Sequence, residues 1–159
     1  LCSESHYDVA RKVADEGIVL LKNNYSVLPI KVNKTTRILV VGENAIKMMT
    51  VGGGSSSLKA QREISPLDGL KSRLGTTVQV DYERGYVGDT TGAYNGVTTG
   101  QNLTEKRSQD ELIRDAVAKA AKADYVIFFG GLKKAAPRNS GCTVLYFLYL
   151  SSVPSGPSM

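Results

Sequence analysis

A short segment rich in glycine and serine is the part of this sequence best suited to contact a small molecule. Residues 52–57 read Gly-Gly-Gly-Ser-Ser-Ser. Because glycine has no Cβ, such a segment can bring backbone N–H groups and small hydroxyls close to a ligand. Glu43 is the acidic residue near this segment in the sequence. Its carboxylate could point into a binding crevice, although a surface position is the more common fate of a glutamate.

The residues around this segment predict a strand before it and a helix after it. Residues 37–42 form an apolar run with β-branched residues that ends in glycine, which is typical of a strand buried on both faces. In a helix at 65–74, Ser65 fits the N-cap, Pro66 the first helical position and Asp68 the capping-box position. Strand, polar loop and capped helix indicate an open α/β sheet with a binding crevice at the strand's carboxyl end.

Two further strands and two further helices complete the predicted fold. Alternating or apolar residues indicate strands at 77–82 and 125–129, and capping residues with apolar stripes indicate helices at 5–21 and 108–122. The order βαβαβ implies the α/β class, with a mainly parallel sheet and right-handed crossovers. Residues 85–100 form a long segment of a kind that is usually functional or mobile. The last helix is expected to turn five residues inward: Leu112, Ile113, Ala116, Val117 and Ala120.

The composition fits a globular domain and argues against several classes of protein. The chain has 159 residues, 42% hydrophobic and 22% charged, which is enough for one domain with its own core. Cys2 and Cys142 match no metal-ligand spacing, and His6 is the only histidine, which argues against histidine-based triads and metal sites. No apolar run reaches the roughly 18 residues of a membrane helix. The missing initiator methionine leads us to expect a chain cut from something longer.

Residues 133–159 differ from the rest of the chain. They contain Lys133, Lys134 and Arg138 and no acidic residue, so they supply most of the net charge of +5. The remainder is close to neutral and has no basic cluster, which argues against nucleic-acid binding. The stretch 143–150 is apolar and lacks charge and proline, a composition that favours aggregation. We expect a divergent tail that does not pack as the preceding residues do.

Several of these residues resemble the C-terminal α/β sandwich domain of family 3 glycoside hydrolases, the β-glucosidase type. The resemblance rests on Ala-Arg-Lys-Val-Ala-Asp-Glu-Gly-Ile-Val-Leu-Leu-Lys-Asn at 10–23, on Leu-Pro-Ile at 28–30, and on the strand, glycine–serine segment and capped helix described above. The run Ile-Val-Leu-Leu-Lys-Asn followed by Leu-Pro is specific to that family. Residues 1–132 are therefore expected to form a partial domain of this type, with residues 133–159 as a tail outside it.

The resemblance implies that catalysis needs a second domain. In such enzymes a separate N-terminal barrel provides the aspartate nucleophile, and a glutamate acid/base commonly lies on the loop after the strand that corresponds to residues 125–129. Retaining hydrolysis needs two carboxyl groups about 5–5.5 Å apart, here from two domains. At that loop this chain has residues 133–142, without a carboxylate. We therefore expect no catalytic residue in this chain and no activity from it alone.

The resemblance also implies a sugar-binding role for the glycine–serine segment. Ser55 corresponds to a serine that contacts the sugar in the subsite before the scissile bond, with Gly54 and Ser56 beside it and Glu43 as a further candidate. The implied substrates are β-glucosides or related oligosaccharides, and the implied partner is the barrel domain of the parent enzyme. Neither a metal, an organic cofactor, nucleic acid nor a membrane is expected, and the parent is expected to be periplasmic or secreted.

Two other functions remain open from the sequence alone. One is a nucleotide- or phosphate-binding α/β module. Against it, the glycines do not form Gly-x-Gly-x-x-Gly directly after the strand, and no Walker lysine follows them. Asp81 ends the second strand but lies farther from the loop than the usual interval of about 20 residues. The other is a carbohydrate-binding or structural module without catalysis.

Overall fold

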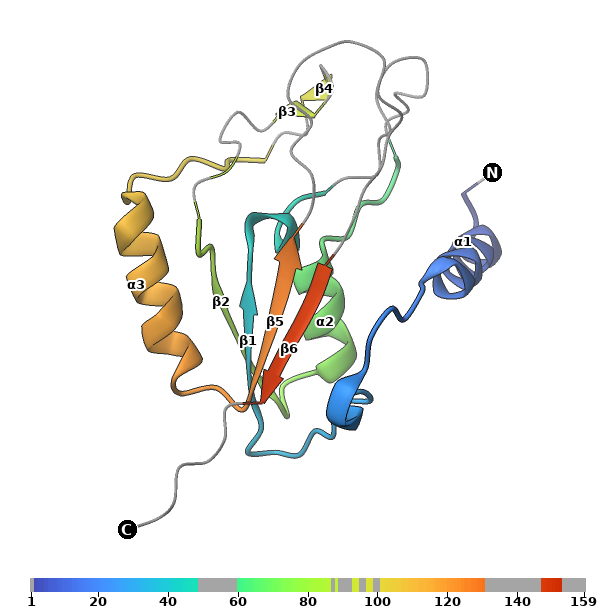
Figure 1. Cartoon of the computed structure of the whole chain (residues 1–159). Helices are drawn as coiled ribbons and strands as arrows, with labels where there is room; N and C mark the ends of the chain where they lie inside the picture. Colours follow the sequence, from blue (N-terminus) through green and yellow to red (C-terminus); the bar gives the residue numbers. More distant parts are fainter. Residues whose placement is uncertain are drawn as a thin grey trace. The chain divides into compact units, whose positions relative to one another are not determined.

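The structure is a computed structural model that describes residues 2–48, 60–86, 88 and 101–130, together with the backbone of 93–94, 97–98 and 147–152 (Figure 1). The chain divides into two compact units, Leu1–Lys31 and Val32–Met159. In the described part of the chain, no helix combines the length and apolar character needed to span a membrane. The same residues contain no group of three or more side chains that could hold a metal ion.

The first unit begins with helix α1, Glu4–Gly17. The N-terminus of this helix is capped by an interaction with His6, whose Nδ1 accepts a hydrogen bond of 3.3 Å from the N–H of Ser3. The prediction that this helix continues to residue 21 is wrong, because Ile18 is already extended, at φ −80° and ψ 124°. A glycine at the last position of the helix and β-branched residues directly after it favour this early end.

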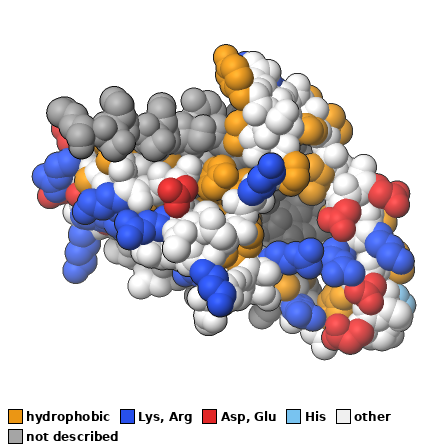
Figure 2. Space-filling model, turned by 90° about the horizontal axis from the view of Figure 1, so that it is seen from below, with side chains coloured by type: hydrophobic (Ala, Val, Ile, Leu, Met, Phe, Trp, Pro, Cys, Tyr) orange, Lys and Arg blue, Asp and Glu red, His pale blue; other side chains and the backbone are white. Residues whose placement is uncertain are grey.

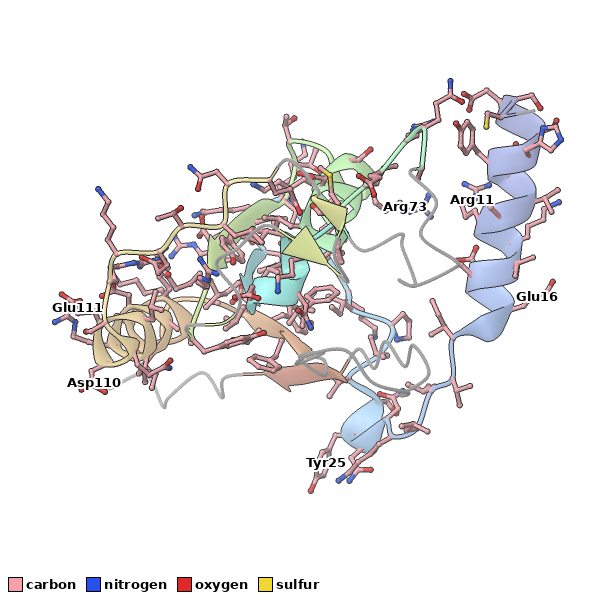
Figure 3. All side chains as sticks on the ribbon, turned by 90° about the horizontal axis from the view of Figure 1, so that it is seen from above. Arg11, Glu16, Tyr25, Arg73, Asp110 and Glu111 are labelled. Carbon is pink, nitrogen blue, oxygen red and sulfur yellow. The ribbon has the colours of Figure 1, made fainter. Side chains whose placement is uncertain are left out.

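The end of the first unit is a turn braced by an amide side chain. After the 3-10 helix η1, Asn24–Ser26, the chain passes close to Asn23 again. Asn23 Nδ2 donates to the carbonyl of Leu28 at 3.0 Å, and Asn23 Oδ1 accepts from the N–H of Leu28 at 2.9 Å. Tyr25, within the turn, points into solvent (Figure 3). The two asparagine contacts hold the turn without a buried core.

The second unit is built on a four-stranded sheet in the order β2-β1-β5-β6. β1 (Arg37–Val41) pairs in parallel with β2 (Gln79–Glu83) and with β5 (Tyr125–Gly130), so that Val40 lies opposite both Tyr82 and Ile127. The predicted parallel α/β sheet is thus confirmed. β6 (Phe147–Ser152), which the sequence pattern does not predict, pairs antiparallel with β5 and covers that edge. A small antiparallel hairpin joins β3 (Ala93–Tyr94) and β4 (Val97–Thr98).

Two helices connect the parallel strands. α2 (Pro66–Leu74) begins at Ser65, whose Oγ accepts from the N–H of Asp68 at 3.2 Å. α3 (Gln109–Ala120) begins at Ser108, whose Oγ accepts from the N–H of Glu111 at 3.3 Å. Both predicted caps are confirmed. Because β2 and β5 lie on either side of β1, right-handed crossovers place α2 and α3 on opposite faces of the sheet (Figure 1).

The core of the second unit is centred on β1. Ile38, Leu39 and Val40 are almost fully buried, as expected for a strand covered on both faces. From α3, Leu112 is fully buried, whereas Ile113 and Val117 are 47% and 64% exposed. The prediction that these last two residues face inward is wrong. Leu112 faces the sheet. Because successive residues of a helix are rotated by about 100° around its axis, Ile113 and Val117 point in other directions.

Candidate functional site

The carboxyl end of β1 is the centre of the candidate site. The chain leaves β1 toward β2 on one side and reaches β5 on the other, and open α/β sheets bind ligands at such a switch point. Gly42, directly after β1, has a φ of +118°, and a Cβ there would collide with the carbonyl oxygen of Phe129 in β5. Its N–H donates to the carbonyl of Glu83 at 3.2 Å. Glycine therefore lets the chain leave the sheet while β1 and β5 stay close.

A single 3-10 turn, η2 (Glu43–Ala45), follows Gly42, and all three of its residues are buried. Glu43 is only 2% exposed. Its Oε2 lies 2.7 Å from Arg84 Nη2, and its Oε1 forms an ion pair with Lys47. A Cβ at Gly88 would collide with the same carboxylate. The expectation of a surface carboxylate is therefore wrong: Glu43 is an internal anion whose two oxygens are both bound by cations of the protein.

Arg84 is a buried residue that sequence reasoning missed. Its side chain is 4% exposed, and its Nη1 donates to the carbonyl of Leu103 at 2.7 Å in addition to the contact with Glu43. Arg84, which directly follows β2, thus joins the turn after β1 to a segment that lies beyond residue 100. Its position two residues after the second predicted strand, 77–82, is the one signal that could have drawn attention to it, because parallel strands end at the same edge.

A second ionic cluster surrounds Glu83, the last residue of β2. Its carboxylate lies 2.8 Å from both Lys119 Nζ and Arg107 Nη1, and Arg107 also contacts Glu105 and Asp115. Burial by itself raises the pKa of Glu83, but hydrogen bonds from Lys119, the Arg84 backbone and Arg107 outweigh it, so the pKa lies below its usual value. Glu83 is therefore ionised at neutral pH and cannot donate a proton.

Two tyrosines line the same end of the sheet. The hydroxyl of Tyr82 donates to the carbonyl of Gly42 at 3.4 Å, and burial raises the pKa of Tyr82 well above its usual value. The ring of Tyr86 lies 6.1 Å from that of Phe128, and burial likewise raises the Tyr86 pKa, with Glu43 adding to the effect. Both phenols remain protonated, so they act as neutral hydrogen-bonding groups at this edge.

The segment that leads into the glycine–serine residues is held by Gln101. Its Oε1 accepts from the N–H of Met48 at 2.9 Å, and its Nε2 donates to the carbonyl of Ile46 at 2.8 Å. These contacts join residues more than fifty positions apart in the sequence. No residue type or spacing in the sequence predicts them.

Three of the predicted sugar-binding residues, Gly54, Ser55 and Ser56, lie outside the described residues. The structure places the chain on either side of them: Met48 follows η2, and Ala60 precedes α2. Of the four predicted residues, Glu43 is therefore the one whose surroundings are known. Its carboxylate binds cations of the protein, and it lies in the turn that precedes the glycine–serine segment in the sequence.

Other charged side chains are intermixed. Figure 2 shows acidic side chains among the basic ones on the face that it draws. At the start of α3, Asp110 and Glu111 lie on the outer side of the sheet unit (Figure 3). Glu111 Oε2 accepts from the N–H of Ser108 at 2.7 Å, and carboxylates in the first turn favour the helix dipole. These two carboxylates stabilise a helix start.

Comparison with known proteins identifies the family. The sequence model for the glycosyl hydrolase family 3 C-terminal domain matches residues 18–143. The chain belongs to this family. Beta-glucosidase BoGH3A of Bacteroides ovatus is 45% identical over 145 residues, which is 84% of this chain and 18% of that protein. Thermostable beta-glucosidase B of Acetivibrio thermocellus is 30% identical over 129 residues, 81% of this chain and 15% of that protein.

Solved structures agree with this assignment. A β-glucosidase from Erythrobacter marinus superimposes with a TM-score of 0.60 at 32% identity, over 82% of this chain and 18% of that one. The β-glucosidase of Kluyveromyces marxianus, in complex with glucose, superimposes with a TM-score of 0.50 at 35% identity, over 58% of this chain and 11% of that one. The chain thus corresponds to less than a fifth of the family 3 proteins it resembles, within their C-terminal domain.

The resemblance stated from the sequence is confirmed by these matches. The α/β fold and the family agree with the expectation from the strand, glycine–serine segment and capped helix. The boundary expected near residue 132 and the separate character of residues 133–159 stay predictions.

Proposed function

We propose that this chain is the part of a β-glucosidase-type glycoside hydrolase that carries a sugar-contacting segment over the active site. The observation that supports this most is the rigid base at the carboxyl end of β1. Glu43, Arg84 and Gln101 fix the backbone through Met48, four residues before the glycine–serine segment begins. A fixed base followed by small residues suits close contact with a hydroxyl-rich ligand.

In this proposal Ser55 contacts the sugar, with Gly54 and Ser56 allowing close approach. Glu43 acts indirectly, by fixing the turn after β1 through its ion pairs, since both of its oxygens are already engaged by Arg84 and Lys47. A β-glucoside or related oligosaccharide is the substrate, and an N-terminal barrel domain of the parent enzyme supplies the nucleophile. No metal or organic cofactor takes part, and the parent is periplasmic or secreted.

The chain alone should be inactive. Retaining hydrolysis needs one carboxylate as nucleophile and one carboxyl group as acid. The two buried carboxylates of the site are unsuited to either role: Glu43 is bound by two cations, and the lowered pKa of Glu83 keeps it from acting as an acid. We expect no release of nitrophenol from an aryl β-glucoside by the purified chain. Turnover above buffer that Glu43→Gln abolishes would contradict the proposal.

Sugar binding can be tested separately from catalysis. We expect glucose to shift the amide NMR signals of residues 52–57 at millimolar concentration, and Ser55→Ala to weaken this binding while the rest of the spectrum is unchanged. Ser72→Ala, on α2, is a matched control that should bind as the wild type does. NAD and ATP, titrated in the same way, should cause no comparable shifts. Saturable shifts with either nucleotide and none with glucose would favour the nucleotide-binding alternative.

A further inference from the structure

Helix α1 has an apolar face and a charged face. Its small and apolar residues recur at a spacing of three or four, which places them on one side of the helix: Val9, Ala10, Val13, Ala14 and Gly17. Its charged residues recur on the other side: Glu4, Asp8, Arg11, Lys12, Asp15 and Glu16. A helix with this pattern normally packs its apolar face against another part of a protein. In α1, however, no residue is buried, and the large apolar side chains Val9 and Val13 are exposed.

The four residues after α1 continue this exposed apolar surface. Residues 18–21 read Ile-Val-Leu-Leu, lie outside any helix, and all four side chains are exposed. The backbone is extended at Ile18, and successive side chains of extended backbone point to opposite sides. A continuous apolar run of this kind is typical of a segment that is covered on both sides. The apolar face of α1 and residues 18–21 together are called the docking surface below.

The first unit cannot cover the docking surface by itself. Its described residues, 2–31, include none that is buried, and a chain of fewer than about 40 residues rarely forms its own core. Apolar surface that stays exposed in this way marks an interaction site. The charged face of α1 has four acidic and two basic residues, which does not suit an anionic membrane surface that attracts lysine and arginine. These features favour a protein partner with an apolar surface.

The family match indicates where this partner comes from. Helix α1 ends at Gly17, and the match to the family 3 C-terminal domain begins at residue 18. The helix therefore lies directly on the N-terminal side of the matched domain. The part that this chain covers is 18% of beta-glucosidase BoGH3A and 15% of thermostable beta-glucosidase B, so most of such a protein lies outside it. A domain in the same chain meets the docking surface at a high effective concentration.

We propose that the docking surface binds the domain that precedes α1 in the parent enzyme. The inference rests on the proposed function, which makes that domain the barrel that supplies the nucleophile. The barrel covers the apolar face of α1 and the side chains of residues 18–21, and the charged face of α1 stays in water. In the isolated chain the docking surface is therefore open.

Hydrogen exchange, followed by mass spectrometry, tests the proposal on the purified chain and on the parent enzyme. The coding sequence that flanks this segment supplies the parent. We expect the amides of residues 5–21 to exchange rapidly in the chain and at least about tenfold more slowly in the parent. Burial of one valine or leucine side chain is enough to shift an equilibrium by about this factor.

A pair of matched variants separates docking from a general effect on stability. Val13 and Val117 both lie on helices and are 66% and 64% exposed, and serine has about the same helix propensity as valine. In the parent, Val13→Ser should accelerate exchange of residues 5–21 about tenfold, whereas Val117→Ser should leave it at the wild-type rate. In the isolated chain, neither variant should change the exchange of these residues.

Several results would overturn the docking proposal. Slow exchange of residues 5–21 in dilute isolated chain would show that the chain covers the surface itself, and slow exchange only in concentrated chain would assign the surface to a second copy. Equally fast exchange in chain and parent, or no effect of Val13→Ser in the parent, would also contradict docking. If the Val13→Ser parent does not fold, the comparison of wild-type chain with wild-type parent decides.

Release of nitrophenol by the parent distinguishes this proposal from the proposed function. A parent that protects residues 5–21 but does not hydrolyse an aryl β-glucoside would refute the proposed function and leave the docking surface in place. An active parent in which these residues exchange as fast as in the chain would refute the docking surface and leave the proposed function in place.

Discussion

Glu43 and Glu83 stand at the ends of neighbouring parallel strands, yet the protein neutralises them in different ways. The cations that meet Glu43 are themselves inside the protein: Arg84 is 4% exposed and Lys47 15%. The cations that meet Glu83 reach it from the surface: Arg107 is 37% exposed and Lys119 48%. Water can therefore replace a lost partner of Glu83 far more easily than a lost partner of Glu43.

This difference suggests that the two clusters contribute differently to stability at the edge of the sheet. Removing one member of a buried ion pair leaves a charge without compensation, whereas a surface pair contributes little. The Glu43 cluster is thus intolerant of change and fixes the base of the site. The Glu83 cluster has several interchangeable partners and joins β2 to α3. Substitutions in the two clusters should therefore differ in their effect on stability.

The largest effect should come from Arg84→Ala. It removes the buried guanidinium that binds Glu43 Oε2, while Lys47 stays at Oε1, and it also frees the carbonyl of Leu103. We expect a loss of about 3–5 kcal/mol in the free energy of unfolding, measured by urea denaturation at pH 7. Arg114→Ala, at a side chain that is 72% exposed, is the control and should cost less than about 1 kcal/mol. Equal losses in the two variants would remove the distinction between the clusters.

Acid should act on the second cluster through Glu83. Because the pKa of Glu83 is lowered in the folded state, its contribution is present above the unfolded pKa of about 4.3 and is lost as the pH falls through the folded value. The free energy of unfolding should therefore decline below about pH 5 less steeply in Glu83→Gln than in the wild type. Glu16→Gln, on the exposed helix α1 (Figure 3), should follow the wild type. Parallel curves for all three would contradict the prediction.

Arg107→Ala should have a smaller effect, despite the three carboxylates that this arginine contacts. Glu83 keeps Lys119 as a partner, and the side chain of Asp115 is 33% exposed, so water can solvate its carboxylate. We expect a loss of about 1 kcal/mol in urea denaturation, and a smaller loss in high salt, which screens exposed charges. A loss as large as that of Arg84→Ala would show that surface cations are as critical as buried ones.

The smallest effect should come from Lys119→Ala. Its ammonium binds the Glu83 carboxylate and the carbonyl of Tyr82, but nearly half of the side chain is exposed and Arg107 remains. We expect a loss of about 0.5 kcal/mol, which urea denaturation in triplicate can resolve. Lys119→Met, which preserves the aliphatic part of the side chain, should lose no more than the alanine variant. A loss in Lys119→Ala that is absent from Lys119→Met would assign the effect to packing of the aliphatic part and contradict the ionic explanation.

The elements that were predicted correctly depend on residues close together in the sequence. The run of apolar residues in β1 gave both its position and its burial, and Ser65 and Ser108 marked helix starts because each caps residues only three positions away. The end of α1 was misplaced because the apolar residues after Gly17 continue the helical pattern, although their backbone is extended. Ile113 and Val117 show that an apolar residue on a helix is no proof of an inward position.

The site itself depends on contacts that no local pattern encodes. Arg84 meets Glu43 across 41 positions, and Gln101 meets Met48 across 53. The type of a residue such as arginine or glutamine does not indicate which distant residue it contacts. The sequence could therefore predict that the site lies at the carboxyl edge of the sheet, but not the network of ion pairs and hydrogen bonds there. The misplaced Glu43 follows from the same cause: without Arg84 in view, a solvated carboxylate was the better expectation.

At Gly42 the structure has no room for even a methyl group. Its missing Cβ leaves just enough room for the carbonyl of Phe129 on the next strand. Any larger residue would have to push the end of β1 away from β5. An alanine at position 42 would therefore act as a spacer between two paired strands, at the edge of the sheet where Tyr82 donates a hydrogen bond to the carbonyl of Gly42.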